Sequence, residues 1–396
     1  MPRRIFTCLW LLAASVIASA QPPASRPAPD DLSDFLETLR TDHDLPAVAA
    51  IVFRTDSILA QGAVGVRARG SEPQVTLDDR FHLGSCTKAM TAALIAKLVE
   101  TGRLKWDDTI ESTFADLRGR ILPEYLPVTL EQLLTHRSGL PEDRAGGPLL
   151  LTLRSLSGSP AEQRQEALPH ILSLKPAAAP GEKMIYSNSG YVVAAAMAEH
   201  ATKRNWEDLM GEFVFESLGI TTGGFGPPGT DAAIDQPRGH RESRGSIKPM
   251  PPESPFSDNP VALFPGGAAH MSLPDWVRFG RDHLAAGKTG RAMLRPDSYR
   301  RLHTPPGDGD YAMGWGVGSS PRLGRTLSHA GSNTMWFALI RLAPERDLGI
   351  VIAANLATRD VMEALPRAAD DLLFRYVRPA ASRPAGSQPA SSQPAR

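Results

Sequence analysis

Strand-type segments occupy both ends of this chain, and helix- and loop-type sequence fills the long middle. The strand-type segments are short runs of β-branched and small apolar residues at 47–53, 58–66, 311–317, 335–342 and 348–354. Residues 103–300 read mainly as helix and loop, with many Pro and Gly breaks. We therefore expect an α+β, two-lobed architecture, in which the N- and C-terminal thirds form one antiparallel sheet and a mostly helical subdomain is inserted between them. Clefts form where such lobes meet.

Three amphipathic or apolar segments flank the expected strands. Residues 31–44 carry apolar side chains at helical spacing, and residues 86–100 form a strong helical pattern that ends at Gly102. Residues 361–377 form a closing helix by the same criterion.

The first twenty residues have the three parts of a secretory signal peptide. Arg3 and Arg4 are followed by an apolar run over residues 5–17 and by the small-residue cleavage pattern Ala-Ser-Ala at 18–20. We expect residues 1–20 to be removed and the protein to be exported, to the periplasm or outside the cell. An uncleaved N-terminal anchor is the alternative, and the paired arginines also match a twin-arginine signal in part.

Two Pro/Ala/Ser-rich segments border the predicted globular part. Residues 21–30 form a linker and residues 379–396 a tail, because this composition buries too little apolar surface to offset the entropy of ordering. The globular domain is then 31–378. Its sheet lobe comprises about 31–84 and 305–378, and its helical lobe about 85–304.

The charge balance excludes one class of partner. The chain has 43 Lys and Arg against 43 Asp and Glu, so no net basic face for nucleic acid is expected. We expect no membrane span in the mature chain. Loss of the leader leaves Cys86 as the single cysteine, so no internal disulfide can form.

The pattern S-x-x-K occurs at Ser85 and Lys88, at the start of the helical segment 86–100. Residues i and i+3 share a helix face, so the Ser85 hydroxyl and the Lys88 amine can meet. A buried lysine loses charge readily and can then accept a proton, which an arginine cannot do. The alternative interpretation is an N-cap serine followed by a surface lysine.

Tyr186 and Asn188 form a second candidate pair in the pattern Y-S-N. A tyrosine near a serine nucleophile can act as a base if a cation lowers its pKa. An asparagine can hold a lysine and a substrate amide at once. The alternative is a turn or capping tyrosine between two helices.

A third element, His329-Ala330-Gly331-Ser332, leads into the strand-type run 335–342. A strand there can line a cleft, with the backbone N–H of Ser332 facing a substrate carbonyl.

With these elements in place, the chain resembles the serine β-lactamase and penicillin-binding-protein-like family. It is most similar to the branch of class C β-lactamases, D-Ala-D-Ala carboxypeptidases and related esterases. Four elements occur in the family's order: S-C-T-K at 85–88, L-L-T-H-R-S-G-L-P at 133–141, Y-S-N at 186–188 and H-A-G at 329–331. Supporting stretches lie at 236–240, 265–272 and 311–316.

The resemblance implies a β-lactamase/transpeptidase-like fold and a role for each site residue. Ser85 is the acylated nucleophile, Lys88 its activating amine and Tyr186 the general base and acid. The sequence leaves open whether Lys88 or Tyr186 takes the serine proton. The substrate-binding residues are Asn188, His329, Gly331 and Ser332, and the N–H groups of Ser85 and Ser332 form the oxyanion hole. The resemblance implies no metal and no cofactor.

His329 stands where β-lactamases usually carry the lysine of K-T-G. A histidine is mostly neutral at pH 7, so we expect weaker recognition of a substrate carboxylate. The chain also spells K-T-G at 288–290, but no strand pattern follows it, and H-A-G is therefore the third motif.

The function expected is an exported serine hydrolase acting through a Ser85 acyl-enzyme on a β-lactam, a D-Ala-D-Ala-type peptide or an ester. One alternative is a D-Ala-D-Ala carboxypeptidase or esterase with little β-lactamase activity. Another is a penicillin-binding sensor that acylates without turnover. A partner other than a small-molecule or peptide substrate is not indicated.

Overall fold

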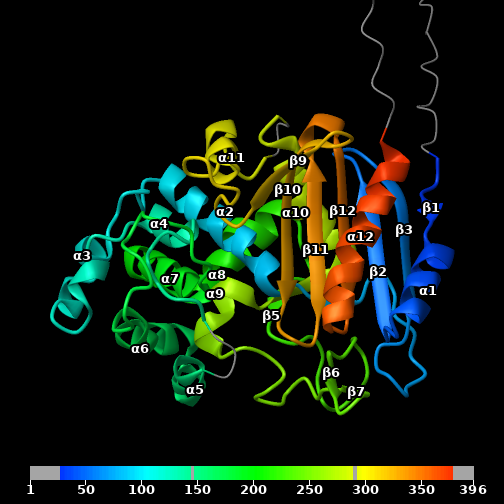
Figure 1. The fold of residues 1–396 in the computed structure, drawn as a ribbon, viewed down its shortest axis with the longest axis horizontal. Coiled ribbons are helices and arrows are strands. Elements are labelled where there is room, and N and C mark those ends of the chain that lie inside the picture. The colour runs from blue at the N-terminus through cyan, green and yellow to red at the C-terminus, as the bar shows by residue number, and fades with distance from the viewer. Residues whose placement is uncertain (1–26, 144–146, 289–291, 378–396) are drawn as a thin grey trace, which may run out of the picture.

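The computed structural model describes residues 27–143, 147–288 and 292–377. The expected signal peptide, most of the expected linker and all of the expected tail lie outside these residues. The main sheet has seven strands in the order β1-β3-β2-β12-β11-β10-β9 (Figure 1). The strands are β1 (Asp30–Asp31), β2 (Ala47–Phe53), β3 (Ile58–Gly65), β9 (Gly316–Ser320), β10 (Gly324–Ser332), β11 (Phe337–Ala343) and β12 (Leu348–Ala354).

The sheet joins the two ends of the chain, as the sequence predicts. β2 and β12 pair antiparallel, with Val351 opposite Ile51, and all neighbours in the sheet are antiparallel except β1 and β3. Every residue of β2 and β12 is buried, which explains why both read as continuous apolar runs rather than alternating ones. The architecture is the expected mixed α/β one, with a central antiparallel sheet and a helical region beside it.

Helices cover both faces of the sheet. α1 (Ser33–Asp42) and α12 (Arg359–Tyr376) pack on one face and bury a second, smaller core. α10 (Leu273–Ala285) packs on the other face, against β2, β11 and β12. The remaining helices are α2 (Thr87–Glu100), α3 (Ile110–Thr113), α4 (Leu130–Leu134), α5 (Pro148–Ser155), α6 (Pro160–Leu172), α7 (Asn188–Thr202), α8 (Trp206–Met210), α9 (Phe264–Gly267) and α11 (Pro296–Leu302).

Short strands accompany the helical region. β4 (Arg80–His82), β8 (Ala269–Ser272) and β5 (Gly224–Phe225) form a three-stranded sheet, and β6 (His240–Ser243) pairs with β7 (Ser246–Pro249). The 3-10 turns η1 (Gly84–Cys86) and η5 (Val261–Leu263) precede α2 and α9.

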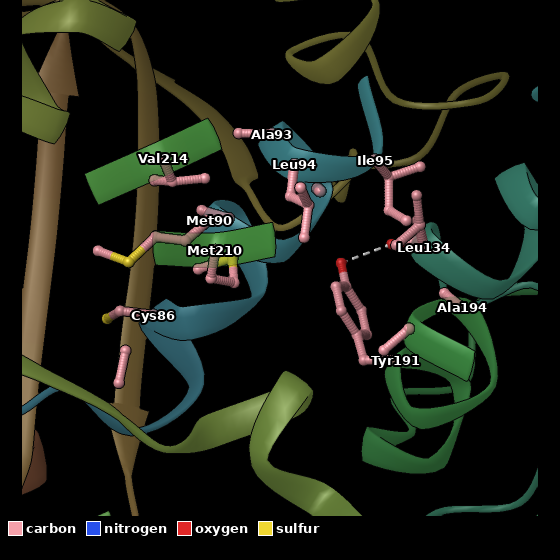
Figure 2. Close-up of a cluster of buried hydrophobic side chains, with 14 of the residues drawn as sticks. Cys86, Met90, Ala93, Leu94, Ile95, Leu134, Tyr191, Ala194, Met210 and Val214 are labelled. Atoms are coloured by element: carbon pink, nitrogen blue, oxygen red, sulfur yellow. Dashed lines mark hydrogen bonds between the residues drawn. The ribbon is translucent and has the colours of Figure 1, made fainter. Parts of the chain in front are cut away.

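The helix α2 lies at the centre of the larger core. Eleven of its fourteen residues are buried, because its sequence is apolar or small on every face. Figure 2 shows its side chains packed against Met210 of α8 and against Tyr191 and Ala194 of α7. The Tyr191 hydroxyl donates to the carbonyl of Leu134, so this buried phenol keeps a hydrogen-bond partner (2.8 Å).

The strand expected at 311–317 is displaced along the chain. The structure begins β9 at Gly316, and Tyr311 makes only an isolated bridge to that glycine. Between them the chain turns tightly: Ala312 N–H donates to the Trp315 carbonyl, and Gly314 has φ +77°. A Cβ at Gly314 would lie 2.5 Å from the Cα of Ala89, so contact with α2 displaces the strand.

β10 keeps a partly unpaired edge beside α2. β9 pairs with β10 only as far as Ser328, whereas β11 pairs with it up to Ser332. Among the strands described, residues 329–332 thus pair with β11 alone. No helix within the described residues is long and apolar enough to cross a membrane.

A buried ion-pair network ties three helices together in the helical region. Arg164 of α6 has no solvent exposure and donates to Glu199 of α7 (3.0 Å from Nε) and to Glu207 of α8 (2.7 Å from Nη2). Glu199 also accepts the backbone N–H of Trp206 (2.8 Å). This network fixes α7, the helix that begins with Asn188.

Substitution Arg164→Met should lower the free energy of unfolding by roughly 3–5 kcal/mol, since it leaves Glu199 buried without its cation. Urea denaturation monitored by circular dichroism measures this change. The control Arg204→Met breaks the exposed Arg204–Glu212 pair and should change stability by less than about 1 kcal/mol. Equal effects of the two variants would contradict the role of the buried network.

Candidate active site

Ser85 and Lys88 meet where η1 leads into α2. The Lys88 Nζ lies 3.1 Å from the Ser85 Oγ. Ser85 is partly exposed, whereas Lys88 has no solvent exposure. The structure therefore forms the pair expected from S-x-x-K, with the lysine in the core and not on the surface.

Two further acceptors fix the orientation of the Lys88 amine. Its Nζ lies 2.6 Å from the Asn188 Oδ1 and 2.5 Å from the Gly266 carbonyl oxygen. Neither oxygen can donate a hydrogen, and the Ser85 hydroxyl is the only one of the three partners that can. A neutral amine that donates to Asn188 and Gly266 consequently directs its lone pair at the Ser85 hydroxyl.

Burial also brings Lys88 close to neutrality. Desolvation lowers the pKa of the Lys88 amine to about 7, and the negative charge of Asp143 opposes that shift. A substantial fraction of Lys88 is then unprotonated at neutral pH. Such a group can accept a proton from Ser85.

Tyr186 lies over the same amine. The Lys88 Nζ is 4.7 Å from the centre of the Tyr186 ring. Burial raises the pKa of Tyr186 above its ordinary value, and its interaction with the Ser85 side chain only partly opposes this. The phenol therefore stays protonated near neutral pH, whereas a substantial fraction of Lys88 is unprotonated there.

Asp143 is a site residue that belongs to none of the sequence motifs. Its carboxylate accepts four hydrogen bonds at the start of α7, from the backbone N–H groups of Asn188 and Ser189 and from the hydroxyls of Ser187 and Ser189. A carboxylate at a helix N-terminus is favourable, because it satisfies free N–H groups there. Asp143 thus holds Asn188 in place 45 residues away in the chain.

Two glycines let η1 and β10 approach each other backbone to backbone. A Cβ at Gly84 would lie 2.3 Å from the backbone nitrogen of Ser332, and Gly84 also has φ +51°. A Cβ at Gly331 would lie 2.6 Å from the nitrogen of Ser85 and 2.1 Å from the carbonyl oxygen of Leu83. The contribution of Gly331 is therefore this close approach, which brings the backbone segments of Ser85 and Ser332 against each other.

His329 is buried in β10 and has both ring nitrogens occupied. Nδ1 lies 2.7 Å from the Ala330 carbonyl, so it carries the hydrogen, and Nε2 accepts from the Tyr311 hydroxyl at 3.1 Å. Burial and then the charge of Lys88 lower the pKa of His329 to about 3. His329 is thus a neutral group where a K-T-G site has a cation.

The other residues near the nucleophile have structural contacts. Cys86 is buried, and its thiol lies 3.3 Å from the His329 carbonyl oxygen, with a raised pKa because of burial. His136 accepts the backbone N–H of Ser187 at 3.2 Å. Lys288 is exposed after the end of α10, and the rest of its K-T-G lies outside the described residues.

No group of three or more His, Cys, Asp or Glu residues that could hold a metal ion is found within the ranges that the structure describes.

The fold is the mixed α/β fold of β-lactamases and transpeptidases, with a serine and a lysine at the start of its central helix. The family model described as Beta-lactamase matches residues 32–373, and the chain belongs to this family.

Its curated relatives include a penicillin-binding protein. Penicillin-binding protein 4 of Amycolatopsis lactamdurans is 29% identical over 268 residues, which are 67% of this chain and 65% of that protein. The chain spans about two thirds of the length of the curated relatives that it matches.

Two solved structures share the fold at low identity. The D-alanine carboxypeptidase AmpC from Burkholderia cenocepacia has a TM-score of 0.67 and 19% identity, over 86% of this chain and 96% of that one. EstCE1, a hydrolase with promiscuous acyltransferase activity, has a TM-score of 0.70 and 19% identity, over 86% and 97%.

Substitution Asp143→Asn should shift the pH dependence of Ser85 reactivity to lower pH. In the unmodified protein, the rate of Ser85 labelling by a fluorophosphonate should rise through pH about 7, as Lys88 loses its proton. Asp143 favours the charged ammonium, so removing its charge lowers the pKa of Lys88 further. Intact-protein mass spectrometry over a series of pH values measures the shift.

Glu142→Gln is the control for this variant, because Glu142 is an exposed carboxylate that directly precedes Asp143 in the chain. It should leave the inflection in place. An unchanged or more alkaline inflection in Asp143→Asn would contradict the electrostatic role of Asp143.

Proposed function

We propose that this protein is an exported serine hydrolase that forms an acyl-enzyme on Ser85 and acts on neutral esters or short peptides in preference to β-lactams. The observation that carries the proposal is the Lys88 amine, which is fully buried and lies 3.1 Å from the Ser85 Oγ. A buried lysine with a pKa of about 7 is poised to accept a proton at neutral pH.

Acylation begins with removal of the Ser85 proton. Lys88 is the better acceptor, because burial lowers its pKa while burial raises the pKa of Tyr186. The Ser85 Oγ then attacks the substrate carbonyl carbon, and the N–H groups of Ser85 and Ser332 bind the resulting oxyanion. Tyr186, whose ring centre lies 4.7 Å from the Lys88 Nζ, passes the proton to the leaving group as the carbon–leaving-group bond breaks.

Deacylation reverses the same proton path with water as the nucleophile. Water loses a proton to the Tyr186–Lys88 pair and attacks the acyl carbonyl, and the Ser85 Oγ leaves with that proton. Asn188 holds Lys88 through its Oδ1 and has an amide NH₂ with which to bind the substrate carbonyl.

The preference for neutral substrates rests on His329. Penicillins and D-Ala-D-Ala peptides carry a carboxylate, and a neutral imidazole with both nitrogens occupied offers it neither charge nor hydrogen. A structurally similar protein, EstCE1, is described as a hydrolase with acyltransferase activity, which is consistent with ester chemistry on this fold.

A peptide substrate is the second candidate, and the edge of β10 favours it. Residues 329–332 lack a strand partner on the side away from β11 among the strands described, so an extended peptide can add there as a short strand. The related D-alanine carboxypeptidase and penicillin-binding protein 4 support this class.

The proposed activity can be tested with purified protein and three substrates: a p-nitrophenyl ester, a D-Ala-D-Ala peptide and a chromogenic cephalosporin. We expect the ester to be hydrolysed fastest, and Ser85→Ala to lower each Ser85-dependent rate by about 10³-fold or more. Ser173→Ala, at an exposed serine, should retain full activity.

The other outcomes separate the alternatives. Stoichiometric labelling of Ser85 without turnover would indicate a penicillin-binding sensor. If none of the three substrates reacts in a way that depends on Ser85, the proposed function is contradicted.

Substitution His329→Lys should raise turnover of a penicillin relative to that of the neutral ester by about tenfold, because a charge-assisted hydrogen bond becomes available to the carboxylate. The ratio of the two kcat/KM values measures this. His200→Lys adds the same charge at an exposed position on α7 and should leave the ratio unchanged. An unchanged ratio in His329→Lys would show that residue 329 does not set carboxylate recognition.

A further inference from the structure

A buried chain of hydrogen bonds connects the two backbone segments that carry the N–H groups of Ser85 and Ser332. It begins at Gly84, whose N–H donates to the His82 Nδ1 at 3.1 Å. The His82 Nε2 lies 2.8 Å from the Asp258 Oδ2. The Asp258 Oδ1 accepts from the Asn333 Nδ2 at 3.1 Å.

These three side chains are almost free of solvent. His82 is 0% exposed, Asn333 5% and Asp258 8%. Buried polar groups of this kind are costly unless every partner is in place. Within the part of the chain described, none of them forms a hydrogen bond or ion pair with Lys88 or Tyr186, so the proton path does not account for them.

The contacts leave one arrangement of hydrogens. Gly84 N–H can only donate, so the His82 Nδ1 must accept, and the hydrogen of the neutral imidazole lies on Nε2 and points at Asp258. One oxygen of the Asp258 side chain accepts this hydrogen, and the other accepts from Asn333 and from the Asn259 backbone N–H (2.8 Å).

At the far end, Asn333 holds the turn that follows Ser332. Its Nδ2 also donates to the Ser257 carbonyl (3.2 Å), and its Oδ1 accepts the N–H of Met335 (3.2 Å). The next residue, Thr334, has φ +75°, which is unfavourable for a β-branched residue. The Thr334 N–H donates to the Ser332 Oγ at 2.9 Å, so the bonds of Asn333 and Ser332 hold this strained turn in place.

We propose that His82, Asp258 and Asn333 are positioning residues that fix the separation of the Ser85 and Ser332 N–H donors. This inference rests on the proposed function, in which those donors bind the oxyanion. Gly84 and Gly331 allow the two segments to touch, and the network bonds to Gly84 in one segment and to Asn333 in the other. The donors must lie about 2.7–3.1 Å from the developing oxyanion, so a small displacement of one segment weakens binding of the transition state and leaves binding of the substrate largely intact.

Asp258→Asn tests the network with little change in shape. If the amide oxygen of the substituted side chain faces Asn333, its NH₂ group faces the Nε2–H of His82. If the amide oxygen faces His82 instead, the NH₂ group faces the N–H donors of Asn333 and Asn259. Either orientation places two donors against each other, so the segments should shift. The double variant Asp258→Asn/Asn333→Asp restores one donor–acceptor match between positions 258 and 333.

Two readouts report on the oxyanion donors without requiring a known substrate: the rate of Ser85 labelling by a fluorophosphonate and the affinity for an alkyl boronic acid, which forms a tetrahedral adduct on a serine. Asp258→Asn should lower both by about ten- to a hundredfold, less than the 10²–10³-fold expected for complete loss of one donor. The fraction of protein that is eventually labelled should stay unchanged, and with an active substrate kcat should fall more than KM rises. The double variant should recover part of the loss.

Asp282→Asn is the matched control, because Asp282 is also 8% exposed and accepts hydrogen bonds from a side chain and a backbone N–H, but lies on α10. It should keep both readouts within about twofold even if it lowers thermal stability. Equal losses in the two variants, or a smaller labelled fraction at an unchanged rate, would show that Asp258 is merely structural and overturn the proposal. A protein that is never labelled at Ser85 would contradict the proposed function itself, whereas normal labelling of Asp258→Asn would contradict the positioning role alone.

Discussion

The burial of the Lys88 amine determines the arrangement of the residues around Ser85. An ammonium removed from water is costly, and Lys88 offsets this with hydrogen bonds to Ser85, Asn188 and the carbonyl of Gly266. These partners come from η1, from the start of α7 and from α9, three segments far apart in the sequence. The same burial lowers the pKa of the amine to about 7. Packing of α2 therefore lowers the pKa of the Lys88 amine and also places its hydrogen-bond partners around it.

The carboxylate of Asp143 opposes the lowered pKa of that amine. Asp143 favours the charged lysine, yet the site keeps His329 neutral through burial and through its bonds to Ala330 and Tyr311. A second cation in this cleft would lower the pKa of Lys88 further by repulsion. A neutral residue at position 329 thus leaves the pKa of Lys88 near neutral pH.

Much of the fold could be predicted from the sequence because the signals were local. The runs 47–53 and 348–354 became β2 and β12 with the same bounds, since strands buried on both faces read as continuous apolar segments. The strand expected at 311–317 was misplaced, because Gly314 turns the chain against α2, a tertiary contact that periodicity does not record. The pairing of Ser85 with Lys88 followed from helical spacing. In contrast, Asp143, the Gly266 carbonyl and the bonds of Asp258 join segments 45 to 178 residues apart, and no spacing rule connects them.

The residues that sequence reasoning missed share a physical task. Asp143 holds the start of α7, Gly266 accepts from Lys88, and Asp258 joins β4 to the turn after β10. Each satisfies a backbone or side-chain group that close packing has removed from water, and an unsatisfied group there would be strongly destabilising. Reacting groups need particular side-chain chemistry and so form recognisable motifs. Groups that position them need only a donor or an acceptor at the right place, which many residue types and any backbone amide can supply. Positioning residues are therefore visible in the folded structure, where the bonds can be traced, and hardly at all in a single sequence.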